Sequence, residues 1–108
     1  MKHDNAILRI AQHYAEQGHT VFINTLHQRE YNYRGLYPDI IITDGNHYPL
    51  LFIEVETDDS VNQLSVKQWQ RYAATDVPLY IAVPQDSVEK AKHLCQVNDI
   101  PAHLVFSY

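Results

Sequence analysis

The sequence contains a single cysteine, Cys95, so no disulfide can form within the chain. This is typical of proteins that fold in a reducing compartment, and we expect a cytoplasmic location. Long hydrophobic runs are also missing, because the apolar stretches are far shorter than the roughly 20 residues that a membrane-spanning helix needs. The first residues lead directly into an amphipathic stretch, so we expect neither a secretory leader nor a membrane partner.

Basic residues are scarce as well. The chain has 8 Lys and Arg residues against 13 Asp and Glu residues, which gives a formal charge of −5 at pH 7. A protein that merely coats nucleic acid is normally basic, so the charge argues mildly against that class. The acidic balance is compatible with a site in which bound cations offset gathered carboxylates.

Apolar residues make up 45% of the 108 residues, as in one packed globular domain that spans residues 1–108. Hydrophobic periodicity and turn residues predict a helix at 4–17, strands at 20–26, 39–43 and 50–57, a helix at 60–74, a strand at 78–83, a helix at 86–97 and a strand at 102–106. Residues 27–37, between the first two predicted strands, are expected to be irregular. This order predicts an α/β fold in which helices flank a mixed central sheet.

The ends of two helices carry capping signals. Asp4 is expected to be the N-cap of the first helix, and Gly18 is expected to be the left-handed residue after its last turn. Ser60 and Gln63 stand at the spacing of a capping box, which predicts that the second helix begins at Ser60.

Three acidic residues occupy positions where strands of this type normally carry apolar side chains. Glu54 and Glu56 are two apart in one strand, so they point to the same face. Pairing the hairpin symmetrically about its turn sets Thr43 opposite Leu50 and Asp39 opposite Glu54, on that same face. The sequence therefore predicts a carboxylate cluster made of Asp39, Glu54 and Glu56.

Such a cluster is unfavourable unless protons or cations compensate for it. Two like charges 4 Å apart repel by about 4 kcal/mol at an effective dielectric constant of 20. Hard oxygen ligands suit Mg²⁺, Mn²⁺ or Ca²⁺ better than zinc, so Mg²⁺ or Mn²⁺ is the expected cofactor. A solvated acidic edge is the alternative, and the continuous apolar runs on both sides of the acids disfavour it.

The segment Tyr37-Pro38-Asp39-Ile40-Ile41-Ile42, followed by Phe52-Ile53-Glu54-Val55-Glu56, resembles the signature of the PD-(D/E)XK nuclease superfamily. The expected element order is similar to the restriction-endonuclease-like αβββαβ core of that superfamily, and the resemblance covers nearly the whole chain. It implies that Asp39, Glu54 and the carbonyl of Val55 hold a divalent metal. It also implies an endonuclease or related hydrolase that binds DNA.

The sequence departs from that signature at one position, where Glu56 replaces the usual lysine. Some restriction enzymes of the superfamily also carry glutamate here. Glu56 is therefore a candidate base or further metal ligand. The alternative is an inactive relative that keeps the fold and binds nucleic acid or a protein partner.

The second helix supplies further candidates. Its apolar stripe is expected to include Val61, Leu64 and Tyr72, with Gln68 as a polar interruption. Gln68 and Tyr72 resemble the Q-x-x-x-Y element of RecB-like and exonuclease branches, which implies contact with the active site and the DNA strand. The alternative is a polar edge residue beside a core tyrosine.

Lys67 lies beside this element on the second helix, and Lys67 and Arg71 are four residues apart on a neighbouring face. Lys67 is a candidate phosphate contact or substitute for the missing lysine, whereas Arg71 is interpreted as solvated surface.

The segment just ahead of Asp39 mixes aromatic residues with two arginines. Arg29, Tyr33 and Arg34 are candidates for nucleic-acid binding through phosphate contacts and base stacking, although such loops also bind proteins. The seven histidines show no metal-ligand spacing and are expected at the surface, while Cys95 is expected in a helix core. We expect no separate recognition domain in a chain of 108 residues, so cutting both strands of DNA would need a homodimer or another partner.

Overall fold

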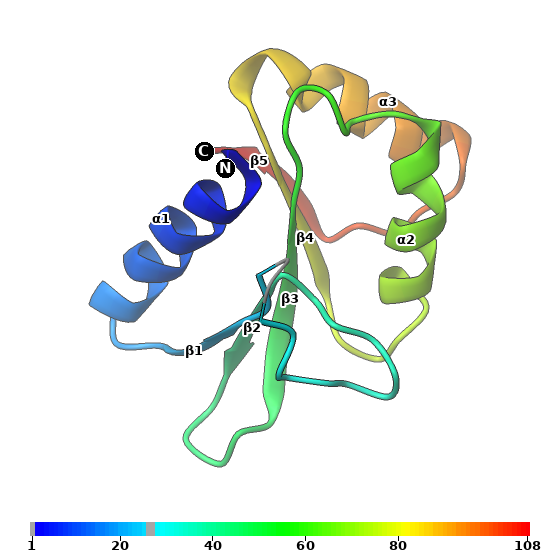
Figure 1. Cartoon of the computed structure of the whole chain (residues 1–108). Coiled ribbons are helices and arrows are strands. Elements are labelled where there is room, and N and C mark those ends of the chain that lie inside the picture. The colour runs from blue at the N-terminus through cyan, green and yellow to red at the C-terminus, as the bar shows by residue number, and fades with distance from the viewer. Residues whose placement is uncertain (1, 26–27) are drawn as a thin grey trace.

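The computed structural model describes residues 2–25 and 28–108. Its elements are α1 (Lys2–Glu16), β1 (Thr20–Ile23), β2 (Ile40–Thr43), β3 (Pro49–Val55), α2 (Gln63–Ala73), β4 (Leu79–Val83), the 3-10 turn η1 (Gln85–Ser87), α3 (Val88–Val97) and β5 (Leu104–Ser107) (Figure 1). The expected order of helices and strands is confirmed, and the fold is α/β. None of the helices described is both long enough and apolar enough to cross a bilayer.

The five strands form one mixed sheet in the order β1-β2-β3-β4-β5. The first three strands pair antiparallel, whereas β3–β4 and β4–β5 are parallel. A parallel pair needs a crossover connection, and α2 and α3 provide the two that this sheet requires. The expected mixed sheet with flanking helices is therefore observed.

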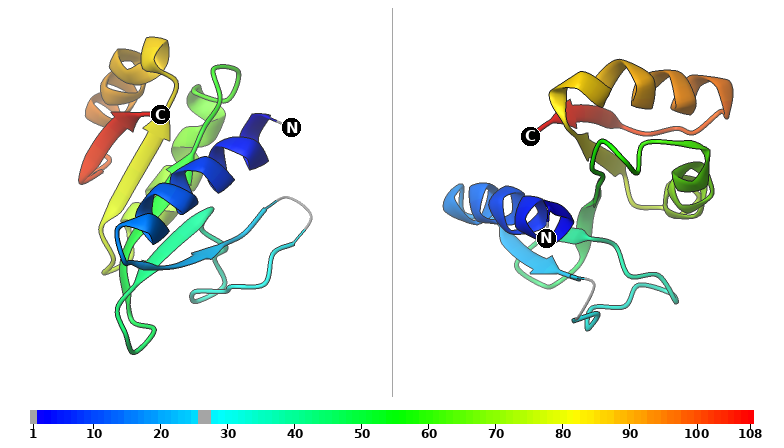
Figure 2. Two further views of the ribbon diagram at one scale, coloured as in Figure 1. Left: turned by 90° about the vertical axis from the view of Figure 1, so that its left-hand side faces the viewer. Right: turned by 45° about the horizontal axis from the view of Figure 1, so that its top comes forward.

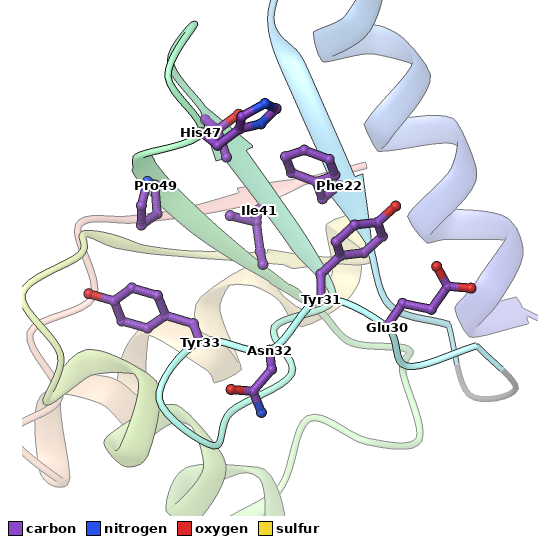
Figure 3. A pocket seen from close by; sticks show the side chains of 9 residues that line it. Phe22, Glu30, Tyr31, Asn32, Tyr33, Ile41, His47 and Pro49 are labelled. Atoms are coloured by element: carbon purple, nitrogen blue, oxygen red, sulfur yellow. The ribbon is translucent and has the colours of Figure 1, made fainter.

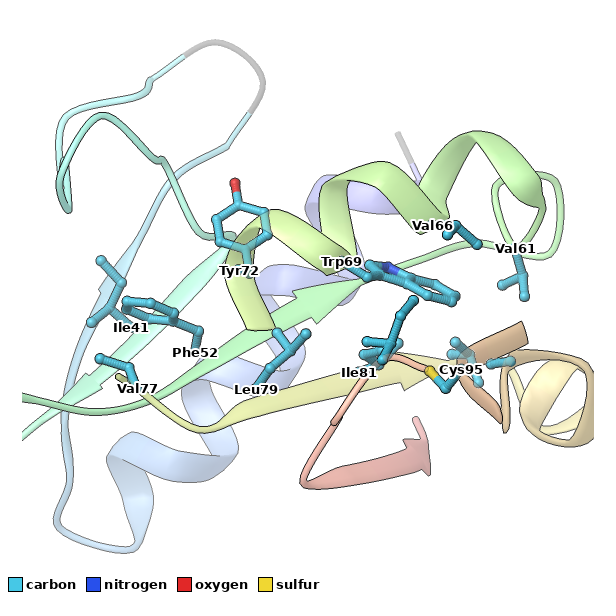
Figure 4. Packing of buried hydrophobic residues seen from close by; sticks show 13 residues of the cluster. Ile41, Phe52, Val61, Val66, Trp69, Tyr72, Val77, Leu79, Ile81 and Cys95 are labelled. Carbon is cyan, nitrogen blue, oxygen red and sulfur yellow. The ribbon is translucent and has the colours of Figure 1, made fainter. Parts of the chain in front are cut away.

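Helices cover the two faces of the sheet unequally, as Figure 2 shows. On one face, α1 packs against the sheet through Ile7 and Ile10, which meet Ile40, Ile42 and other residues of one buried cluster. On the other face, α2 and α3 build a second cluster around Phe52 and Trp69 (Figure 4). Because both faces are covered, all four residues of β2 are buried, which accounts for its continuous apolar sequence.

Two of the predicted helix starts are wrong. The first helix begins at Lys2, so Asp4 lies inside its first turn and is not the N-cap. The second helix begins at Gln63 after Asn62, whose side chain accepts a hydrogen bond from the Leu64 N–H at 2.9 Å. The prediction for the end of the first helix is confirmed, because Gly18 follows the last turn in the left-handed conformation, with a φ of +92°.

Strand β1 is shorter than predicted because a buried asparagine ends it. The Asn24 amide donates to the carbonyls of Tyr31 and Pro38 at 2.9 and 2.7 Å, and its oxygen accepts from the N–H groups of Glu30 and Tyr31. These bonds fasten loop 28–37 to the end of the strand. The predicted strand residue Leu26 and the predicted loop residue His27 lie outside the described residues.

The buried face of α2 is also displaced from the prediction. Its buried residues are Ser65, Val66, Trp69 and Tyr72, whereas Leu64 is 86% exposed. Trp69 is wholly buried and is the largest side chain of the helix, so it directs this face toward the sheet. Gln68 therefore lies at the margin of the buried face.

Candidate functional site

The carboxylate cluster is built where β2 begins and β3 ends. Ile40 pairs with Ile53, so the next step along the ladder sets Asp39 beside Glu54, as expected. The Asp39 N–H donates to Oε2 of Glu54 at 2.9 Å, and the Val55 N–H donates to Oδ2 of Asp39 at 2.8 Å. These two bonds lock the acids side by side.

One detail of the expected pairing is wrong. Thr43 pairs with Pro49, not with Leu50, because the register shifts between Ile42 and Thr43 next to the turn. The shift lies at the far end of the strands from the carboxylates, so the pairing of Asp39 with Glu54 is unaffected.

Glu54 lies at the centre of the cluster and is only 2% exposed. Its Oε1 accepts a hydrogen bond from Nε2 of Gln68 at 3.0 Å, so α2 reaches the cluster through the polar residue at its margin. Burial raises the pKa of Glu54 well above its ordinary value, and the charge of Asp39 raises it further.

Glu56 lies on the same face, two residues further along the chain. Burial, and then the charge of Asp39, raise the pKa of Glu56 to about 7, against the opposing effects of His3 and of the Ser65 and Ser60 hydroxyls. The backbone around it is fixed, because its N–H donates to Ala82 at 2.9 Å and its carbonyl accepts from the Tyr108 hydroxyl at 2.7 Å. Glu56 thus holds a carboxyl group that titrates near neutral pH.

His3 is a member of the site that the sequence did not suggest. Its Nε2 lies 3.2 Å from Oδ2 of Asp39, and its side chain is 25% exposed. The hydrogen bond to Asp39 raises the pKa of His3 to about 9, although burial opposes the shift. The expectation of a surface histidine is therefore wrong for His3, because α1 packs with its first turn against the end of β2.

We expect the metal-free protein to lose stability as the pH rises from 4.5 to 9. The folded-state pKa of Glu56, about 7, lies above its ordinary value of 4.5, so the folded chain binds more protons between these values and its free energy of unfolding falls with pH. The raised pKa of His3 lowers the free energy of unfolding in the same way as the pH rises from 6.5 to about 9. Melting temperatures in EDTA across this range test the expectation, and a midpoint that rises toward pH 8 would contradict it.

The donor set matches the expected cofactor in its chemistry. Asp39, Glu54 and Glu56 offer carboxylate oxygens and Val55 offers a carbonyl, which are the hard ligands that Mg²⁺ and Mn²⁺ prefer. Within residues 2–25 and 28–108, no three His, Cys, Asp or Glu side chains are already grouped around a metal position. The carboxylate oxygens face N–H donors instead, so a cation would have to displace part of the contacts from Gln68 or His3.

A polar cavity of about 220 Å³ adjoins the cluster on the side of α2. Its lining residues are Arg29, Gly35, Leu36, Tyr37, Gln68, Arg71 and Tyr72. Two arginines from separate segments therefore meet beside the glutamine that binds Glu54. Arg71, interpreted from the sequence as solvated surface, lines this cavity, and only the position of loop 28–37 over α2 reveals it.

The other predicted contact residues have mixed surroundings. The ring of Tyr72 belongs to the core and is 4% exposed, while its hydroxyl accepts from Gln68 at 3.4 Å. Burial raises the pKa of Tyr72 to about 12, so its hydroxyl stays protonated. Lys67 is exposed on α2.

Tyr33 and Arg34 both bind the same acidic residue. The Tyr33 hydroxyl donates to Oδ1 of Asp76 at 2.7 Å, and Nη1 of Arg34 lies 3.8 Å from that oxygen. The Arg34 guanidinium also lies over the Tyr33 ring, 5.1 Å from its centroid. Their polar contacts therefore hold loop 28–37 against the end of α2.

In comparisons with known proteins, no family model, no curated sequence and no solved structure matches this chain.

Proposed function

We propose that this chain is a metal-dependent nuclease of the PD-(D/E)XK type that hydrolyses phosphodiester bonds in DNA. The observation that carries the proposal is the buried pairing of Asp39 with Glu54, with Glu56 on the same sheet face. Isolated buried carboxylates are strongly disfavoured, and a site that holds several of them is a functional candidate. The order of elements supports a restriction-endonuclease-like core.

Each group has a role that follows from its position. Asp39, Glu54 and the Val55 carbonyl would hold Mg²⁺ or Mn²⁺, which when bound supplies positive charge beside the scissile phosphate. Glu56 accepts the proton of the attacking water, since a group with a pKa of about 7 serves as a base near neutral pH. Arg29 and Arg71 bind the phosphates that flank the cleaved bond.

We expect Mg²⁺ or Mn²⁺ to raise the melting temperature. A cation that binds only the folded state at ten times its Kd stabilises by about 1.4 kcal/mol, or about 6 °C for a domain of this size. Asp39→Asn, which removes one charge and keeps the shape, should lose most of the shift. No shift in wild type at tens of millimolar metal would contradict the proposed metal site.

The activity itself is tested by incubating the purified protein with plasmid and with single-stranded DNA, in Mg²⁺, in Mn²⁺ and in EDTA. Metal-dependent cleavage is the expected result. If both strands of a plasmid are cut, measuring the molecular mass in solution would test whether the protein acts as a homodimer.

The second candidate is an inactive module of the same fold that binds nucleic acid or a protein. The hydrogen bonds already made by the carboxylates favour it, because both oxygens of Glu54 accept from groups of the chain itself. Nucleic-acid binding without cleavage, together with no metal-induced stabilisation, would select this candidate.

A further inference from the structure

A second cavity, of about 470 Å³, opens on the sheet face that carries the carboxylates. Its lining residues are Phe22, Glu30, Tyr31, Asn32, Tyr33, Ile41, Thr43, His47 and Pro49. Figure 3 shows Phe22, Tyr31 and His47 on one side of Ile41 and Tyr33 on the other. The size and the mixture of aromatic walls with a few polar groups are those of a site for a small organic ring.

The aromatic side chains gather in a way that leaves ring surface open to solvent. The Phe22 and Tyr31 rings lie 4.6 Å apart between centroids, and Phe22 and His47 lie 5.5 Å apart. Tyr31 is nevertheless 39% exposed. The hydrogen bonds of its backbone to Asn24 hold the loop in place, so the ring is presented by a fixed backbone.

The cavity is aligned with the carboxylate cluster. Ile41, in the cavity, and Asp39 are two residues apart in the chain, so they share a face and lie about 7 Å apart along the strand direction. Loop 28–37 lines both cavities, with residues 30–33 at the aromatic one and residues 29 and 35–37 at the polar one. The two cavities therefore lie on the two sides of a single loop.

Charge indicates what kind of ligand would bridge the two sides. Half of the 8 basic residues in this acidic chain lie in this loop and in α2, namely Arg29, Arg34, Lys67 and Arg71. Arg34 is paired with Asp76, whereas Arg29 and Arg71 line the polar cavity itself. A ligand that is anionic at one end and a neutral aromatic ring at the other matches this arrangement. A nucleotide has that chemistry, with its base on aromatic side chains and its phosphate on arginine.

We propose that the aromatic cavity binds the base of an unpaired nucleotide, while neighbouring phosphates occupy the arginine-lined cavity beside Glu54. The proposal rests on the proposed nuclease function for its substrate class, and it makes that substrate single-stranded or locally unpaired DNA. A base inside a duplex is stacked and paired, and its ring is not available to Tyr31.

The test measures binding of two fluorescent single strands, an oligothymidylate and an abasic strand of the same length and charge, with Ca²⁺ and again in EDTA. Wild type is expected to bind the oligothymidylate roughly tenfold more tightly, since stacking on an aromatic ring has about that effect. Tyr31→Leu should abolish the difference and Tyr31→Phe should retain it. Tyr48→Leu is the matched control, because Tyr48 is 69% exposed and does not line the cavity.

Equal binding of both strands by wild type, or binding of neither, would overturn the proposal. An equal loss of affinity for both strands in Tyr31→Leu would also overturn the proposal. The ring would then contact the DNA backbone or support the protein fold, and would not bind the base. The outcome is independent of cleavage. Base-dependent binding without hydrolysis contradicts the nuclease function alone, and hydrolysis without base-dependent binding contradicts the base cavity alone.

A titration followed by NMR separates a nucleotide from a protein side chain as the occupant. Thymidine monophosphate is expected to shift the ring signals of Phe22, Tyr31 and His47, and N-acetyltyrosinamide is expected to leave them unchanged. The reverse pattern would assign the cavity to an aromatic residue of a protein partner and would refute the proposal.

Discussion

Asp39→Asn and Glu54→Gln are each expected to reduce cleavage about a thousandfold, since losing about 4 kcal/mol of metal-dependent stabilisation has that effect on the rate. Both amides keep the shape of the site. The new amide in Asp39→Asn would still offer an oxygen to the Val55 N–H, and the one in Glu54→Gln would still offer an oxygen to the Asp39 N–H. Cleavage of plasmid under single-turnover conditions measures the loss, and unchanged cleavage in either variant would refute the site.

Alanine at Glu54 has a different expected effect on stability. The sequence alone predicts that removing one of several like charges lets the metal-free variant melt at or above wild type. In the structure Glu54→Ala also leaves the buried Asp39 N–H and the Gln68 amide without their acceptor, and a lost partner of this kind costs about 1–3 kcal/mol. In Glu54→Gln one oxygen still accepts from the Asp39 N–H, and the Gln68 amide can turn over so that its oxygen accepts from the new NH2 group. We therefore expect Glu54→Gln to melt at or above wild type and Glu54→Ala to melt below it.

Glu56→Ala is expected to reduce cleavage at least about a hundredfold, whereas Lys67→Ala should change it by less than about threefold. Glu56 lies on the face of Glu54, partly buried and under the influence of Asp39, whereas Lys67 is exposed on α2. Glu56→Lys should retain some activity, because it restores the lysine that the signature resembled by this sequence usually carries at this strand position.

The pH profile distinguishes a base from a structural residue at this position. With wild type, the cleavage rate should rise with pH through about 7 as Glu56 ionises, and Glu56→Lys should shift or remove that rise. Full activity in Glu56→Ala together with complete loss in Lys67→Ala would show that the lysine function has moved to the helix.

The parts of the site that the sequence predicts are those set by local geometry. Alternation along a strand fixes the shared face of Glu54 and Glu56, and the hairpin brings Asp39 opposite Glu54 through a short connection. The register shift at Thr43 was not predictable from symmetry, because it depends on how Asp44 bonds the turn. Its Oδ1 accepts from the N–H groups of Asn46 and Tyr48.

The parts that the sequence did not predict depend on packing between distant segments. No pattern in the chain indicates that residue 3 meets residue 39, since that contact follows from how α1 lies across the sheet. Arg71 and Arg29 likewise share a cavity only because loop 28–37 lies over α2. The predicted stripe was right at Val61 and Tyr72, which are buried, and wrong at Leu64, because the wholly buried Trp69 sets a different side of α2 against the sheet.

The position of the Asp39–Glu54 pair between two helical layers has a consequence for the order of folding. A chain that has formed only the β2–β3 hairpin already holds Asp39 beside Glu54, through a contact that spans 15 residues. His3 arrives from 36 residues away and Gln68 from 14, on elements that pack against opposite faces of the sheet. The hairpin contact and the Gln68 contact close loops of similar length, whereas the His3 contact closes a much longer loop at a higher entropic cost. We therefore expect the carboxylates to gain the Gln68 donor as α2 docks, and the His3 donor only once α1 has docked as well.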